Sequence, residues 1–425
     1  MIESLDVYLW DKRVGTLVES RTGYKKQISF YYDSEFIKAG IDIAPLSASI
    51  FSIAAQRGLP IYPEKDKAFE GLPAFISDSL PDHWGNSVFN EWAKKHGKRQ
   101  RDLSSLDRLA YIGSRGMGAL EFRPPAFPDN EVPFKVQIKE LTALAQDVLK
   151  NAGNFKTNLS ENLQIESLFK VGTSAGGRRP KAVINFNPAT GDCYSGQVYM
   201  ARDGFIPMII KFDEHSGIPT TLIEYSYWLL AQAAGLNMMP SILWKSGDES
   251  HFLTQRFDRK GAEKLHIQTL AAMMPNATSY EELFLVANKL GIAPEEFEML
   301  FRQMILNILT GNVDDHSKNF SFIMNASGEW HIAPAYDFTF AVDPSAPGYI
   351  NRHSLTLNGT NEHFTKRDLL SISRAFSIKR AEAILDEVMP VVQNYRRYAK
   401  QAGVPEEWTL KIEAEIADRI ADCLG

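Results

Sequence analysis

Cysteine is nearly absent from this sequence of 425 residues, which contains only Cys193 and Cys423. Two thiols are too few for a disulfide framework or a cysteine-built metal site, and they suggest a reducing compartment. The sequence also lacks a positively charged start followed by an apolar stretch, so no signal peptide is predicted. No apolar run approaches the roughly 20 residues that a membrane-spanning helix needs. We therefore expect a cytoplasmic protein that has no membrane partner.

An excess of positive charge is missing as well. The 46 lysine and arginine residues are outnumbered by 52 acidic residues, which gives a net charge of −6. Such a chain is a poor overall match for nucleic acid, although a local basic patch stays open. Hydrophobic residues make up 44% of the chain and charged residues 23%, as in globular proteins with a full core. These values exclude a disordered regulator, a fibre and a disulfide-stapled miniprotein.

Hydrophobic periodicity predicts an α+β protein whose first strands lie near the N-terminus. Antiparallel strands are expected at residues 5–10, 14–18 and 27–32, and helices at about 82–96 and 103–111. A proline-rich break at residues 124–130 is the best candidate linker. The other expected elements are strands at 182–186, 207–212, 320–324 and 329–333 and helices at 222–234, 297–310 and 366–421.

The most informative segment is the polar loop at residues 311–320, GNVDDHSKNF, between an apolar helix and an apolar strand. Asn319 follows Asp314 by five residues, the separation of the catalytic Asp and the metal-holding Asn in protein-kinase catalytic loops. After a short hairpin, Asp337 stands where a kinase holds its second metal ligand. Phosphoryl transfer needs a base that orients the attacking hydroxyl and hard oxygen ligands for Mg²⁺. Asp314, Asn319 and Asp337 supply that set.

Groups suited to phosphate lie upstream of this loop. Residues 172–181, GTSAGGRRPK, form a glycine-rich stretch, and glycines let backbone N–H groups approach phosphate oxygens. The spacing is not that of a Walker A loop. Lys181 ends the stretch, and Lys211 lies on an apolar strand, like the kinase lysine that touches the phosphates. Glu224 lies on the next helix, where a kinase pairs an acid with that lysine.

Further motifs follow one another along most of the chain. They are LPD at 80–82, IGSRGMGAL at 112–120, SAGGRRPK at 174–181, IIK at 209–211, RFDR at 256–259, GNVDDHSKNFS at 311–321 and APAYD at 333–337. Found together and in this order, they resemble the HipA family of serine/threonine kinases, the toxin halves of bacterial toxin–antitoxin pairs. The resemblance implies a small β-rich N-terminal domain followed by a bilobal protein-kinase-like unit with a helical C-terminal lobe. The corresponding domains are residues 1–125, 126–260 and 261–425.

The resemblance also implies chemistry and partners. The expected activity is ATP- and Mg²⁺-dependent phosphorylation of serine or threonine, with the active site in the cleft between the lobes. The expected substrate is a translation-related protein such as an aminoacyl-tRNA synthetase. The expected partner is a helix-turn-helix antitoxin of the HipB type, through which DNA is contacted only indirectly.

Carried onto this sequence, the resemblance makes Asp314 the catalytic base and Asn319 and Asp337 the Mg²⁺ ligands. Ser174 matches the serine that the family autophosphorylates, with Thr173 as the adjacent competitor. The residues expected to contact the nucleotide are Lys181, Lys211, Gly176, Gly177, His316, Lys318, Gln255 and Phe257, the last two beside the adenine.

Simpler interpretations stay open for several of these residues. Glu224 forms either a capping box with Thr221 or an ion pair with Lys211. A structural role in holding the loop is the alternative for His316, and Asp315 is interpreted as an ordinary loop acid. For the whole protein the alternatives are a small-molecule phosphotransferase and a catalytically silent corepressor bound to a DNA-binding antitoxin. The joint presence of the base, the metal ligands and Lys211 argues against a silent protein.

Overall fold

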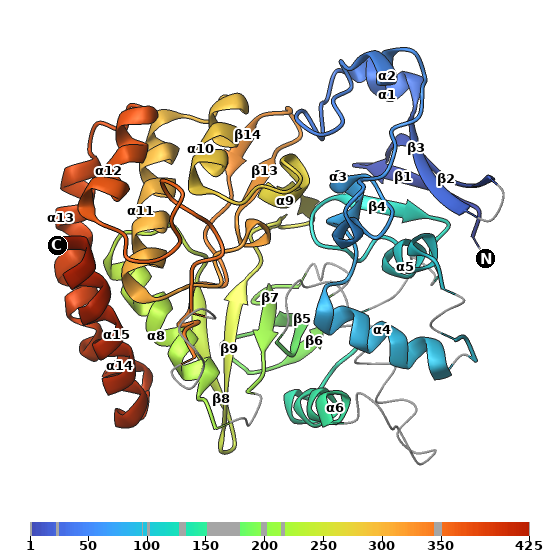
Figure 1. Ribbon diagram of the computed structural model, residues 1–425. Coiled ribbons are helices and arrows are strands. Elements are labelled where there is room, and N and C mark those ends of the chain that lie inside the picture. The colour runs from blue at the N-terminus through green and yellow to red at the C-terminus, as the bar shows by residue number, and fades with distance from the viewer. Residues whose placement is uncertain are drawn as a thin grey trace. The chain divides into compact units, whose positions relative to one another are not determined.

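The computed structural model describes residues 2–22, 25–95, 97–99, 103–126, 133–150, 179–196, 202–213, 217–343 and 351–424. The chain forms two compact units, each built from segments that are separate in the sequence (Figure 1). Unit 1 comprises Met1–Glu214, Trp244–Gln268 and Met324–Gly328, and unit 2 comprises His215–Leu243, Thr269–Ile323 and Glu329–Gly425. The division into three domains predicted from the sequence stays a prediction.

Unit 1 begins with a four-stranded sheet in the order β3-β2-β1-β4. Its strands are β1 (Ser4–Leu9), β2 (Lys12–Thr22), β3 (Lys25–Tyr32) and β4 (Leu120–Arg123). The three predicted N-terminal strands are confirmed, and their pairing is antiparallel. Apolar and polar residues alternate along β1, and Leu5, Val7 and Leu9 are buried while the residues between them are not. The pattern had not predicted β4, which is only four residues long.

Helices of unit 1 carry aromatic side chains into its core. They are α1 (Ser34–Ala39), α2 (Ile53–Gln56), α3 (Ala74–Ser77), α4 (His83–Lys95), α5 (Ser105–Ile112) and α6 (Ile138–Lys150). The helices α4 and α5 were predicted, and Phe89 and Trp92 on α4 pack against Tyr111 on α5. A capping box between Ser104 and Asp107 starts α5.

A second sheet in the order β6-β5-β7-β9-β8 follows. Its strands are β5 (Lys181–Phe186), β6 (Cys193–Ser195), β7 (Ile206–Lys211), β8 (Ser241–Ser246) and β9 (Glu249–Gln255). The strand β5 is buried along its whole length, as expected of a strand covered on both faces. A short ribbon of β10 (Arg259–Lys260) and β11 (Glu263–Lys264) comes after β9, and β12 (His266–Thr269) leads into unit 2.

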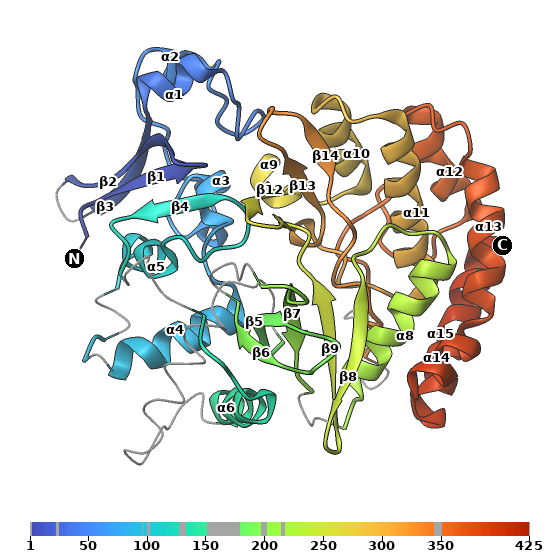
Figure 2. The ribbon, with the colours of Figure 1, turned by 180° about the vertical axis from the view of Figure 1, so that it is seen from behind.

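Unit 2 is largely helical and is organised around α11 (Pro294–Thr310), whose C-terminal half is buried all round. Figures 1 and 2 show α13 and α15 beside α11. The other elements are α8 (Thr220–Ala233), α9 (Leu270–Met273), α10 (Tyr280–Lys289), β13 (Ser321–Met324), β14 (Trp330–Ile332), α12 (Lys366–Ala375), α13 (Ala381–Gln393), α14 (Tyr395–Ala402) and α15 (Glu406–Leu424). The predicted hairpin and C-terminal helices are confirmed. Among the described helices, none has the length and apolar character needed to cross a membrane.

Candidate active site

The loop that the sequence singled out begins at a glycine that the backbone requires. Gly311 ends α11 in the left-handed region at φ +71°, and its N–H donates to the carbonyl of Asn307. A Cβ at this position would lie 3.2 Å from Val342 and 3.3 Å from Glu415, so a larger residue would be strained and crowded. The chain therefore leaves the buried helix in a defined direction.

Asp314 and Asn319 meet within this loop. The Asn319 side-chain amide donates to the Asp314 backbone carbonyl at 2.7 Å, which closes the loop on itself. His316 caps the short turn Ser317–Asn319, because its Nδ1 accepts from the Lys318 N–H at 3.2 Å. The carboxylate of Asp314 stays 68% exposed, with His316 Nε2 at 3.7 Å from it. The loop thus offers an accessible carboxylate and fulfils the structural role considered for His316.

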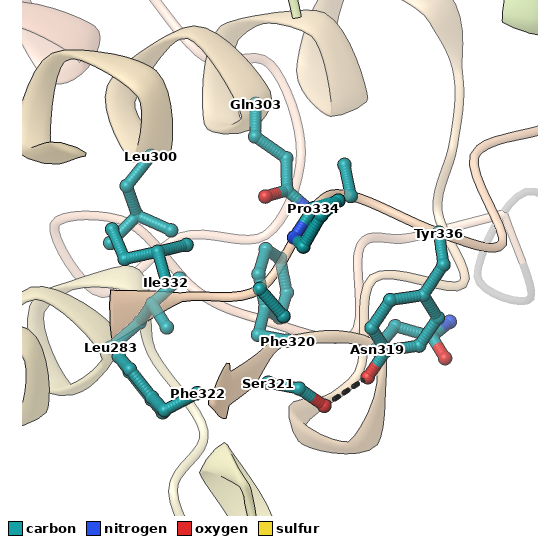
Figure 3. Close-up of a pocket in the computed structure, with 12 residues that line it drawn as sticks. Leu283, Leu300, Gln303, Asn319, Phe320, Ser321, Phe322, Ile332, Pro334 and Tyr336 are labelled. Atoms are coloured by element: carbon teal, nitrogen blue, oxygen red, sulfur yellow. Dashed lines mark hydrogen bonds between the residues drawn. The ribbon is translucent and has the colours of Figure 1, made fainter. Parts of the chain in front are cut away.

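Tyr336 braces the turn on both sides of Asn319. Its hydroxyl donates to the carbonyl of Lys318 at 2.7 Å and lies 2.6 Å from Ser321 Oγ (Figure 3). Asp337 follows directly with a φ of +50°, a left-handed conformation that non-glycine residues seldom adopt. Such strain is concentrated at functional positions, because the surroundings must hold it in place. One tyrosine thereby connects the segments that carry the two predicted metal ligands.

A pocket lies behind this turn, with Asn319 and Tyr336 on its wall (Figure 3). Apolar groups dominate its lining, so it offers few donors to a phosphate or a metal ion. Its lining residues are Leu283, Leu300, Gln303, Asn319, Phe320, Ser321, Phe322, Ile332, Ala333, Pro334, Ala335 and Tyr336.

The donor set of unit 2 suits Mg²⁺ that arrives with a nucleotide. Over the described part of the chain, no group of three or more His, Cys, Asp or Glu side chains could hold a metal ion. Asn319 and Asp337 contribute one amide and one carboxylate, both hard oxygen ligands. Mg²⁺ commonly takes one or two protein carboxylates and completes its octahedron with phosphates and water. The residues present therefore fit Mg²⁺ bound through phosphate, and they do not form a separate metal cage.

Two lysines of unit 1 face each other across neighbouring strands. Lys181 begins β5, Lys211 ends β7, and the two are direct partners in the antiparallel register. Directly opposite residues project from the same face of a sheet. Both residues are buried, with 3% and 7% of their surface exposed. The Lys211 ammonium also lies 5.9 Å from the centre of the Phe252 ring. The structure thus places the two predicted phosphate contacts side by side, and their role stays a prediction.

The RFDR motif binds the N-terminal glycine motif. Asp258 accepts from Arg256 at 2.9 and 2.7 Å, from Arg259 at 2.5 Å and from the Gly118 N–H at 2.8 Å. Arg259 in turn donates to the carbonyls of Gly116 and Gly118. Burial alone would raise the pKa of Asp258, but the two arginine charges outweigh it and hold that pKa far below the usual value. These charged residues are structural, and they hold the segment at 112–120.

Gln255 and Phe257, predicted beside the adenine, alternate with the buried residues of this motif. Both are half-buried, whereas Arg256 and Asp258 are almost completely buried. The structure thus leaves the two predicted contact residues partly accessible, and their role stays a prediction. Lys318 is exposed within the turn Ser317–Asn319 of unit 2. Ser174, Thr173, Gly176 and Gly177 lie outside the described residues.

One of the two alternatives for Glu224 and the interpretation of Asp315 are wrong. The capping box at Thr221 does not form, because α8 already begins at Thr220 with Pro219 at its N-cap and no side-chain cap. Glu224 is instead buried on α8, a helix that unit 2 anchors through a 2.5 Å bond from Tyr227 to the Thr310 carbonyl. Asp315 is not an ordinary loop acid, since only 1% of it is exposed. No local pattern indicates that Asp315 is buried, because its side-chain partners lie 35 residues earlier and 38 residues later in the chain.

Comparisons with known proteins agree with this arrangement of motifs. A model of the HipA-like C-terminal domain matches residues 173–396, and a model of the HipA N-terminal domain matches residues 5–123. Among solved structures, the fold is similar to a chain in the complex of HipA, HipB and operator DNA from the Shewanella oneidensis MR-1 toxin–antitoxin system. The TM-score is 0.64 at 15% identity, over 99% of this chain and 96% of that one.

A weaker likeness concerns the Helicobacter pylori proinflammatory kinase CtkA. It has a TM-score of 0.37 and 13% identity, over 58% of this chain and 89% of that one. This likeness is too distant to support an inference. The matches to the family and to the Shewanella chain confirm the predicted α+β class with its small N-terminal sheet.

Proposed function

This chain belongs to the HipA family, and from that premise we propose that it is a toxin-type kinase that transfers the γ-phosphoryl group of ATP to a serine or threonine of a protein. The observation that carries the proposal is the loop of unit 2. There the backbone carbonyl of the exposed Asp314 accepts a hydrogen bond from Asn319. Tyr336, the residue before Asp337, donates a hydrogen bond to the same turn. These are the base and the two oxygen ligands that phosphoryl transfer requires.

Each residue has a defined role in this proposal. Asp314 accepts the proton of the attacking hydroxyl and orients that oxygen toward the phosphorus. Asn319 and Asp337 hold Mg²⁺, which neutralises the charge of the phosphates. Lys181 and Lys211 bind phosphate oxygens, and Gln255 and Phe257 border the adenine. His316 and Lys318 contact the nucleotide from the turn of unit 2. Gly176 and Gly177 let backbone N–H groups of the glycine-rich stretch approach its phosphates.

Regulation and partners form a second part of the proposal. Ser174 would be the site of autophosphorylation, because it lies seven residues before Lys181 in the glycine-rich stretch. A phosphate adds about −1.5 to −2 charges, which would repel a triphosphate bound beside it. The Shewanella chain is part of a complex with HipB and operator DNA. This supports a HipB-type antitoxin as partner, with DNA contacted through it. A translation-related enzyme such as an aminoacyl-tRNA synthetase is the proposed substrate.

Phosphoryl transfer from radiolabelled Mg·ATP tests the proposal directly. The purified protein should label itself and a protein in a cell extract, whereas Asp314→Asn should label neither while still binding ATP. The matched control is Asp386→Asn, the same change on an exposed residue of α13 in the same unit. Labelling of a metabolite panel alone would replace the protein kinase by a small-molecule phosphotransferase. If calorimetry detected no Mg·ATP binding, the kinase proposal would be withdrawn in favour of a silent corepressor.

A further inference from the structure

Two adjacent aspartates of the loop have opposite environments. The side chain of Asp314 is 68% exposed, and that of Asp315 is completely buried. A buried carboxylate is costly unless several donors satisfy it. Asp315 has three: Tyr280 Oη at 2.5 Å, His353 Nδ1 at 2.8 Å and the Ser354 N–H at 2.7 Å. The hydrogen bonds that keep Asp315 buried thus accompany an exposed side chain at Asp314.

The donors come from parts of unit 2 that are far apart in the sequence. Tyr280 is the first residue of α10, and its hydroxyl also accepts from Asn307 of α11 at 3.4 Å. Asn312, next to Gly311, donates to Asn307 at 3.0 Å. The loop is therefore tied at two points to a buried polar network. Buried hydrogen bonds of this kind restrict the arrangement of the groups that they join.

His353 links this network to the C-terminal helix. Arg419 of α15 lies 2.8 Å from His353 Nε2, and guanidinium N–H groups can only donate. Nε2 must then accept, so the ring hydrogen is on Nδ1 and points at Asp315. Arg419 itself is held by Glu415 one turn earlier at 2.7 Å. The chain of contacts extends from α15 through His353 to the residue beside the proposed base.

We propose that His353 and Arg419 are positioning residues, which fix the backbone at residues 312–319 through Asp315 and so hold Asp314 in its outward position. The catalytic part of this inference rests on the proposed function, whereas the fixing of the loop does not. His353 touches no reacting group. Its contribution is geometric, and displacement of a catalytic group by about 1 Å can cost 100-fold in rate.

Two variants of His353 separate the hydrogen bond from the mere presence of a side chain. His353→Leu removes the donor to Asp315, whereas His353→Asn keeps an N–H at the position of Nδ1. We expect His353→Leu to raise amide hydrogen exchange in a peptide covering residues 312–320 about tenfold. It should also lower kcat about 10- to 100-fold with little change in KM for ATP. His353→Asn should restore both values to near those of the wild type.

The matched control is Thr409→Val, which removes a buried hydroxyl from the same helix as Arg419 without a contact to the loop. It should leave the exchange of the loop peptide unchanged. The inference is overturned if the loop peptide of His353→Leu exchanges its amide hydrogens as slowly as that of this control. It is also overturned if the loop peptide of His353→Asn exchanges as fast as that of His353→Leu. Tyr280→Phe deletes another donor to Asp315 and replaces His353→Leu if that variant does not fold. If the wild type transfers no phosphate, the proposed function fails, yet the exchange data still decide the positioning role.

Discussion

Lys181 and Lys211 stand directly opposite each other on two antiparallel strands, and both are buried. Like charges in this relationship oppose pairing of the strands, so their juxtaposition is hard to attribute to stability alone. Lys181 also accepts, through its carbonyl, a 2.8 Å hydrogen bond from the indole of Trp84 on α4. The backbone that carries the pair is thereby fixed by the N-terminal part of unit 1. The proposed phosphate contact of this pair can be tested at either lysine.

The first prediction concerns Lys211→Met, which keeps the length of the side chain and removes its charge. We expect ATP affinity to fall about 10- to 100-fold, because a hydrogen bond to a charged group contributes about 1.5–3 kcal/mol. The increase in Tm that Mg·ATP produces in the wild type should largely disappear. Lys245→Met, an exposed position on β8 of the same sheet, should keep that increase. Equal responses of the two variants would remove Lys211 from the phosphate site.

The second prediction concerns Asp258→Asn in the RFDR motif. The amide would remove the carboxylate that compensates the buried Arg256 and Arg259, and its N–H₂ would face the Gly118 N–H or a guanidinium. Breaking a buried ion pair by removing one partner costs about 3–5 kcal/mol. Urea unfolding should show a loss of this size, against almost none for Asp248→Asn in the exposed turn before β9. A change below about 1 kcal/mol would show that the motif does not hold the segment at 112–120.

Individual elements show what the sequence could and could not predict. Alternation predicted β1 to β3, and the kinase spacing predicted that Asp314 and Asn319 belong together, because both signals are local. The predicted start of α8 is two residues too late, because a plausible capping motif at Thr221 points to residue 222 whereas the helix begins at Thr220. The burial of Asp315 could not be predicted, because the donors to its carboxylate come from α10 and from the segment after residue 350. Contacts between distant segments leave no local pattern to read.

The third prediction is a pH dependence of stability that originates at His266. This residue is fully buried, donates through Nε2 to the Ile43 carbonyl at 3.0 Å, and burial lowers its pKa to about 4. In the unfolded chain a histidine binds its proton at about pH 6.5. Between these values the unfolded state holds more protons, so stability is complete above about pH 6.5 and is lost as the pH falls toward 4.

His266→Gln keeps a donor near Nε2 and removes the titration. Urea midpoints at pH 7 and pH 5 should therefore differ less in this variant than in the wild type. Between pH 7 and pH 5 the wild type should lose at most about 2 kcal/mol more of its free energy of unfolding than the variant. The same fall in stability for both proteins would place the pH dependence elsewhere.

The last prediction uses the backbone of Asp337. A residue with β-carbon at φ +50° is strained, and glycine relieves that strain, whereas alanine has no side-chain hydrogen bond to compensate for it. Asp337→Gly should therefore unfold at the same temperature as the wild type or a few degrees higher, and Asp337→Ala should unfold at a lower temperature. Both variants lack the carboxylate, so both should bind Mg·ATP more weakly, by about tenfold or more, while binding of metal-free ATP changes little.

Differential scanning calorimetry and titration with and without Mg²⁺ measure the two effects separately. A stable Asp337→Gly protein with full Mg·ATP affinity would show that the strain serves something other than a metal. Weak binding by both variants, despite their opposite stabilities, would show that the chain sacrifices stability at Asp337 to hold a ligand there.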